Sequence, residues 1–89
     1  MDTSPIRVLH VDDEPSFVNL TREFIEREDD RFTIETATSA DKGLDKIKHQ
    51  PPDCVVSDYD MPGKNGIEFL NAVRETTPDL PFILFTGKG

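Results

Sequence analysis

Four short apolar runs recur along the chain, and segments with helical spacing separate them. The runs cover residues 6–11, 32–37, 54–57 and 81–85. The first run is apolar apart from Arg7 and His10, as expected of a strand that is buried on both faces. Apolar and polar residues alternate in the second run, which indicates a half-exposed strand at the edge of a sheet.

The three segments between these runs predict helices, because each carries a start or a stop signal. Pro15 suits the first turn of a helix, where the missing N–H of proline matters least. Thr38 or Ser39 can cap a second, shorter helix. A third helix is expected over residues 66–76 and ends before Pro78.

Within each predicted helix, apolar residues recur three or four positions apart and mark the face that we expect to be buried. In chain order these residues are Phe17, Leu20, Phe24 and Ile25, then Ala40, Leu44 and Ile47, and finally Ile67, Leu70 and Val73. Strands that alternate with short helices form parallel sheets. The pattern therefore predicts an α/β fold with a mostly parallel sheet.

Composition limits the classes of function. The chain has 89 residues, enough for one domain, and its 18 acidic and 10 basic residues give a net charge of -8. This charge argues against binding to nucleic acids or anionic membranes through this segment, since no basic patch is available. No apolar stretch reaches the ~20 residues that span a bilayer, and the N-terminus lacks the features of a signal peptide, so we expect a cytoplasmic protein.

Three residues with reactive side chains are expected to be structural. Cys54 is the only cysteine and lies in an apolar run, so it is expected to be a small buried hydrophobe. His10 and His49 have no partners at the spacing of metal ligands. None of the three is therefore a candidate for catalysis or metal binding.

Acidic residues follow two of the predicted strands. Asp12 and Asp13 come directly after the first strand, and Asp58 comes directly after the third. In open α/β sheets, the carboxyl ends of the strands line the crevice where ligands bind. We therefore expect one acidic cluster, which is costly to bury unless a divalent cation neutralises it. Carboxylate oxygens in this arrangement suit Mg²⁺, which usually keeps several waters.

A carboxylate in such a cluster can also act as a nucleophile. A metal ion can hold phosphate oxygens and bring an electrophilic phosphorus against one carboxylate, which then forms an acyl phosphate. Thr86 follows the fourth predicted strand, where its hydroxyl can hydrogen-bond a phosphoryl oxygen. Gly87 leaves room for the group and offers its backbone N–H.

Three motifs surround these residues. They are Val11-Asp12-Asp13-Glu14, then Ser57-Asp58-Tyr59-Asp60-Met61-Pro62-Gly63 with Asn65-Gly66, and finally Phe85-Thr86-Gly87. Together they resemble a response-regulator receiver domain of two-component signalling, of the chemotaxis-regulator type. The resemblance implies a three-layer, flavodoxin-like fold, in which helices cover both faces of a parallel sheet of strand order 2-1-3-4-5. It also implies a phospho-accepting signalling domain rather than an enzyme.

The resemblance assigns roles to four acidic residues. Asp58 would accept the phosphoryl group from a histidine kinase or a phosphotransfer protein. Asp13 would bind Mg²⁺ directly, together with Asp58 and the backbone carbonyl of Asp60. Asp12 would bind the ion through a water molecule.

The family pattern also covers residues after the fourth strand. Thr86, with Gly87 beside it, would move to hold the phosphoryl group. Lys88 and Asp60 stand at positions that flank the attacking water in this family. We therefore expect this pair to influence the lifetime of the acyl phosphate.

The sequence departs from the family at its C-terminal end. Receiver domains continue through a helix, a fifth strand that begins near an invariant lysine, and a final helix, whereas this sequence stops at Gly89. We therefore expect residues 1–89 to be an incomplete receiver domain that lacks this strand and the last two helices. The fourth strand would then be an exposed apolar edge, through which copies of the chain can associate as a homo-oligomer.

Two other functions stay open. Asp58-Tyr59-Asp60 resembles the Asp-x-Asp motif of haloacid-dehalogenase-type phosphatases, but Pro62 stands where that motif has Thr or Val, and Asp12-Asp13 would be unexplained. The second alternative is a receiver-like binding module that is not phosphorylated, because the invariant lysine cannot be assigned. Separately, we expect Tyr59, which follows Asp58, to face solvent.

Overall fold

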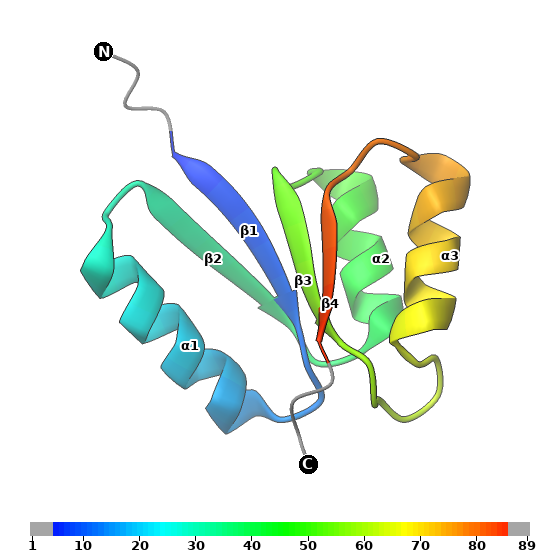
Figure 1. Ribbon diagram of the computed structural model, residues 1–89, viewed down its shortest axis with the longest axis horizontal. Coiled ribbons are helices and arrows are strands. Elements are labelled where there is room, and N and C mark those ends of the chain that lie inside the picture. Colours follow the sequence, from blue (N-terminus) through cyan, green and yellow to red (C-terminus); the bar gives the residue numbers. More distant parts are fainter. Residues whose placement is uncertain (1–4, 86–89) are drawn as a thin grey trace.

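The computed structural model describes residues 5–85, which form one four-stranded sheet flanked by helices (Figure 1). The strands are β1 (Ile6–Val11), β2 (Phe32–Ala37), β3 (Cys54–Asp58) and β4 (Phe82–Phe85). Their order across the sheet is β2-β1-β3-β4, and each neighbouring pair is parallel. This order confirms the predicted flavodoxin-like α/β fold, with the second strand at one edge.

Helices cover both faces of the sheet. Figure 1 shows α1 (Pro15–Glu28) beside β2 on one face, and α2 (Ala40–His49) with α3 (Gly66–Thr76) on the opposite face. Ser39 caps α2, as expected, because its Oγ accepts a hydrogen bond from the backbone N–H of Lys42 at 3.2 Å. Within residues 5–85, no helix has the length and apolar character needed to cross a membrane.

The main core lies between the sheet and the pair α2 and α3. Its buried residues come from the strands, from both helices and from the loops beside them: Leu9, Val11, Ala37, Ala40, Ile47, Val55, Met61, Phe69, Val73 and Leu80. Since side chains alternate along a strand, Val8 and His10 on β1 and Val56 and Asp58 on β3 point to the α1 side. The acceptor candidate Asp58 therefore lies on the face opposite the main core.

Contacts at the amino ends of the strands fix the alignment of β1 and β3. The backbone N–H of Arg7 donates to Asp53 Oδ2 at 2.7 Å, and the N–H of Asp53 donates to the carbonyl of Arg7 at 2.8 Å. The Arg7 guanidinium also pairs with Glu35 on β2 and donates to the carbonyl of Pro51 at 2.8 Å. These contacts tie three strands together at the end of the sheet opposite the acids.

The predicted buried face of α1 is wrong at Leu20 and Phe24. Leu20 and Phe24 are 66% and 62% exposed, whereas Val18 is buried and Ile25 is half-buried. The side chain of Phe17 lies outside the described part of the structure. Val18 and Ile25 are seven residues apart and share the helix face toward the sheet, so the two largest exposed apolar residues lie on another face.

One residue of the predicted buried face of α3 is also wrong. Ile67 is exposed, while Val73 is buried and Leu70 is half-buried, as predicted. Phe69, which the prediction left out, is fully buried, and its ring packs edge-on against Phe82 at a centroid distance of 5.4 Å. The buried face therefore includes Phe69 and Val73, four residues apart on one side of the helix.

Gly66 begins α3 where the helix comes closest to the end of β3. A Cβ atom at this position would lie 2.7 Å from the carbonyl oxygen of Asp58 and 2.8 Å from Cα of Tyr59. Both are backbone atoms, which cannot move aside as the end of a flexible side chain can. The absence of a side chain therefore lets α3 pack directly on the end of β3.

We predict that Gly66→Ala destabilises the domain by about 2 kcal/mol, the scale of overpacking in a close-packed interior. Urea unfolding followed by circular dichroism would measure the loss. Gly63→Asn is a matched control, since Gly63 has a φ of 80° in open space and Asn tolerates this conformation. Equal stability of Gly66→Ala and the wild type would contradict the packing argument.

Candidate functional site

Three acids meet at the carboxyl ends of β1 and β3. The two strands are adjacent and parallel, and Val11 is level with Ser57, so Asp12 follows β1 at the level where Asp58 ends β3. One carboxylate oxygen from each of Asp12, Asp13 and Asp58 lies within 4.8 Å of the others. The structure thus brings together the three acids that the strand pattern predicted as a cluster.

Two of these carboxylates are inside the protein. The exposed fractions of Asp12 and Asp58 are 0% and 1%, while Asp13 is half-buried. The backbone N–H of Glu14 donates to Asp12 Oδ1 at 3.0 Å, and that of Asp60 donates to Asp58 Oδ1 at 3.3 Å. Each buried carboxylate is therefore oriented by the backbone two residues further along the chain.

The donor set fits a hard divalent cation. Three carboxylates supply oxygen ligands from adjacent strand ends, and two of them are withdrawn from bulk water. Burying several negative charges together is unfavourable unless positive charge compensates them. Mg²⁺ is commonly held by a few carboxylates together with water, so the residues present can hold this ion.

The structure places the other predicted site residues less completely. The backbone of Asp60 lies beside the cluster, through its hydrogen bond to Asp58, and its side chain is exposed. Thr86, Gly87 and Lys88 lie outside the described residues. The carbonyl of Phe85, the last residue of β4, accepts a hydrogen bond from the N–H of Tyr59 at 2.9 Å. The strand that precedes Thr86 therefore ends next to Asp58.

His10 lies closer to the acids than its sequence position suggested. It is 3% exposed, and its ring packs against the ring of Phe85 at a centroid distance of 5.9 Å. Burial lowers the pKa of His10, while the negative charges of Asp12 and Asp58 act in the opposite direction. The signal in the sequence was its spacing: a residue two positions before Asp12 points to the same face.

Two other predictions concern residues around the site. Tyr59 is exposed, as predicted, directly after the acceptor. Cys54 is half-buried rather than buried, and burial together with the charge of Asp53 raises the pKa of its thiol. A raised pKa keeps the thiol protonated, which agrees with an unreactive side chain.

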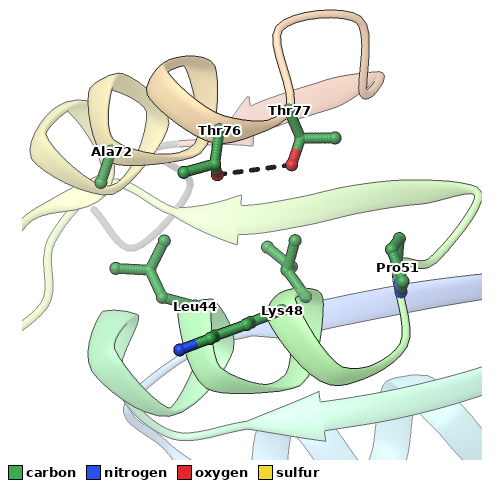
Figure 2. A pocket seen from close by; sticks show the side chains of 7 residues that line it. Leu44, Lys48, Pro51, Ala72, Thr76 and Thr77 are labelled. Atoms are coloured by element: carbon green, nitrogen blue, oxygen red, sulfur yellow. Dashed lines mark hydrogen bonds between the residues drawn. The ribbon is translucent and has the colours of Figure 1, made fainter.

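A hollow lies away from the acids, between α2 and α3. It has a volume of about 550 Å³, and Leu44, Ile47 and Ala72 contribute apolar surface to it. Figure 2 shows Thr76 and Thr77 at its edge, with their hydroxyl groups hydrogen-bonded to each other. It has no acidic residue in its lining. The acid cluster, rather than this hollow, is the candidate site for chemistry.

The chain is similar to known proteins over most of its length. The sequence profile of the response regulator receiver domain family matches residues 8–89. Response regulator Rre1 of Synechocystis is 36% identical over 87 residues, which are 96% of this chain and 37% of Rre1. A protein-glutamate methylesterase/protein-glutamine glutaminase of Clostridium acetobutylicum is 37% identical over 82 residues, which are 92% of this chain and 24% of that protein. The chain spans well under half the length of these curated relatives.

Solved structures show the same similarity in three dimensions. The response regulator TrrA of Thermotoga maritima, in complex with Mg²⁺ and BeF, is 33% identical with a TM-score of 0.85. The match covers 94% of this chain and 71% of TrrA. In a second structure TrrA is in complex with the histidine kinase ThkA, and there the TM-score is 0.84 at 33% identity and the same coverage of both chains.

We predict that Asp58→Asn stabilises the protein in the absence of metal. Its free energy of unfolding should rise by about 1 kcal/mol, because the variant removes one of three crowded negative charges. A ligand that binds only the folded state stabilises the protein. Because the variant lacks one candidate metal ligand, it should gain less stability from Mg²⁺ than the wild type. Urea unfolding with EDTA and with Mg²⁺ would measure both effects. Asp60→Asn is the control, because its exposed side chain lies outside the cluster. A less stable metal-free Asp58→Asn protein would contradict charge crowding.

Proposed function

The chain belongs to the response regulator receiver domain family, and from this premise we propose that Asp58 accepts a phosphoryl group in the presence of Mg²⁺. Receiver domains are signalling modules of two-component systems. The observation that carries the proposal is the cluster of Asp12, Asp13 and Asp58 at the ends of two adjacent strands. A nucleophile and candidate metal ligands lie together there, as phosphoryl transfer requires.

The proposed donor is a phosphohistidine of a histidine kinase or of a phosphotransfer protein. A carboxylate oxygen of Asp58 attacks phosphorus, the P–O bond forms as the P–N bond breaks, and the released imidazole nitrogen takes up a proton from solvent. The backbone N–H of Asp60 donates a hydrogen bond to Asp58 Oδ1 and so holds the carboxylate in one orientation. Mg²⁺, when bound, neutralises negative charge that would otherwise repel the incoming phosphoryl group.

We assign the metal to the acids and to one backbone group. Asp13 and Asp58 bind it directly, Asp12 binds through water, and the carbonyl of Asp60 completes the protein ligands. The burial of Asp12 and Asp58 supports this assignment, because a buried pair of carboxylates gains most from a cation. The similarity to TrrA, whose structure contains Mg²⁺ and BeF, supports the same metal.

The residues after β4 complete the proposed site. Thr86 and Gly87 hold the phosphoryl oxygens, and Lys88 with Asp60 sets the lifetime of the acyl phosphate. The alignment of Asp58 with Phe85 supports this placement, because the chain that follows Phe85 continues from the edge where the acids lie. A lifetime unchanged in Lys88→Ala would remove Lys88 from the proposal.

The proposed domain accepts phosphate without turning over a substrate. An Asp-x-Asp phosphatase would use Asp58 and Asp60 and would leave Asp12 and Asp13 without a role, although both lie within reach of Asp58. A module that is never phosphorylated would leave Asp58 without a role as nucleophile, although it lies within reach of the candidate metal ligands Asp12 and Asp13. Some relatives join such a segment to further enzymes or regulators, so we propose that the effect of phosphorylation is exerted through attached or partner domains.

A histidine kinase is the proposed protein partner. TrrA has been captured in complex with the histidine kinase ThkA, and this chain matches TrrA over most of its own length. The net charge of -8 opposes contact with nucleic acid through this segment. A second copy of the chain is a further proposed partner, through the edge strand β4.

We predict that Asp58→Asn takes up no phosphoryl group from phosphoramidate with Mg²⁺, because the nucleophile is gone. Intact-protein mass spectrometry would show a phosphorylated wild type whose adduct is released by hydroxylamine, as an acyl phosphate is. Asp45→Asn, at an exposed position of α2 outside the cluster, is the matched control and should still be phosphorylated. An adduct on Asp58→Asn would contradict Asp58 as the acceptor, whereas rapid wild-type turnover of p-nitrophenyl phosphate would favour the phosphatase instead.

We also predict concentration-dependent self-association through the edge of β4. Within the described strands β4 pairs only with β3, and Ile83 on this strand is 57% exposed. Ile83→Lys should keep the protein monomeric, since a lysine on an edge strand discourages pairing. Sedimentation velocity over a concentration series would measure this. Ile67→Lys, an equal change at an exposed position of α3, should leave self-association unchanged. A wild type that is monomeric throughout would rule the dimer out.

A further inference from the structure

Two aromatic rings meet across the acceptor strand on the α1 side of the sheet. The rings of His10 on β1 and Phe85 on β4 have centroids 5.9 Å apart and planes inclined by 52°. The strand β3 runs between them, with Val56 level with His10 and Asp58 level with Phe85. The contact therefore passes diagonally over β3 between Val56 and Asp58.

The ring pair lies at the inner side of the acid cluster. His10 precedes Asp12 by two residues on the same strand face, and the charges of both Asp12 and Asp58 act on its imidazole. His10 and Asp58 are buried, and Phe85 is half-buried. Asp58, which is level with Phe85 and whose charge acts on His10, thus lies beside the ring pair.

A histidine is a costly choice for this position if it serves only to fill space. The neighbouring residues of β1 are Leu9 and Val11, and an aliphatic side chain at position 10 would be buried without the cost of desolvating an imidazole. A flat ring also has few rotamers and fits against another ring. A rigid ring suits a group that must hold its neighbour in one orientation.

We propose that His10 and Phe85 form a positioning pair, which holds the Asp58 carboxylate in the orientation that attacks phosphorus. The proposal rests on the proposed function of Asp58 as phospho-acceptor. Neither ring exchanges an atom in the reaction. With phosphoramidate as donor, the Asp58 oxygen bonds to phosphorus, the P–N bond breaks, and ammonia leaves after its nitrogen takes a proton from solvent.

Loss of the ring contact should slow the reaction without weakening the binding of the donor. Small displacements of a reacting group change rates strongly, because the attacking atom must be held at short range and in line. For His10→Val we expect the phosphorylation rate at saturating phosphoramidate to fall about tenfold, with KM unchanged. His10→Phe keeps a ring against Phe85 and should restore most of the rate.

A second readout does not depend on phosphorylation. Tyr59 is the only tyrosine, the chain has no tryptophan, and Tyr59 directly follows the acceptor, so its fluorescence can report Mg²⁺ binding without a donor. Residues that orient metal ligands typically affect affinity about tenfold or more, and we expect His10→Val to weaken Mg²⁺ binding on this scale. Val8→Ala is the matched control: Val8 is buried on the same strand and face, one pleat further from the acids.

The outcomes separate the proposal from general loosening of the fold. His10→Val with wild-type rate and Mg²⁺ affinity would overturn it, as would equal losses in Val8→Ala at equal stability. His10→Phe as slow as His10→Val would also overturn it, because the ring contact would then not be the cause. If His10→Val fails to fold, Phe85→Leu removes the other ring, and the same losses are expected.

Failure of the proposed function would look different. A wild-type protein that takes up no phosphoryl group would contradict phospho-acceptance by Asp58. The Mg²⁺ titration of His10→Val against Val8→Ala would then decide alone whether the ring pair positions Asp58.

Discussion

The parallel alignment of β1 and β3 is the constraint on which the rest of the structure depends. Because Val11 lies level with Ser57, both strands end at one level and their acids meet. A shift by one residue would turn Asp58 toward the main core, where α2 and α3 pack. The reciprocal hydrogen bonds of Arg7 and Asp53 hold the same alignment at the far end of the strands. One pairing therefore sets both the packing and the site.

The elements and their order could be predicted from the sequence, because strands, caps and helix stops leave local signals. The buried helix faces could be predicted only in part. Leu20 and Phe24 are large and apolar, yet which side of α1 meets the sheet depends on where the sheet lies, and no local spacing contains that information. Val18, which is smaller, faces inward instead.

The acids of the site could be predicted from the local sequence, since they follow apolar strands. The spacing of His10 before Asp12 indicated its strand face, but its contact with Phe85 could not be predicted, because Phe85 lies on a strand whose place in the sheet is known only in the folded chain. The roles of Thr86, Gly87 and Lys88 stay predictions. Gly66 shows a further limit: glycine is required there because backbone atoms at the end of β3 leave no room for a side chain, and this contact exists only in the folded chain.

The burial of two carboxylates has a consequence for how the domain meets its partners. Asp12 and Asp58 are buried and are only two of the 18 acidic residues, so the field that an approaching molecule feels at long range comes mainly from the other acids. That field attracts cations and slows small anionic phosphodonors, and salt weakens it over about 10 Å. For the proposed phospho-acceptor, encounter would therefore favour donors that present their phosphoryl group within a basic protein surface. The surface charge thus affects which molecules approach the domain, while the buried acids are the proposed site of the reaction.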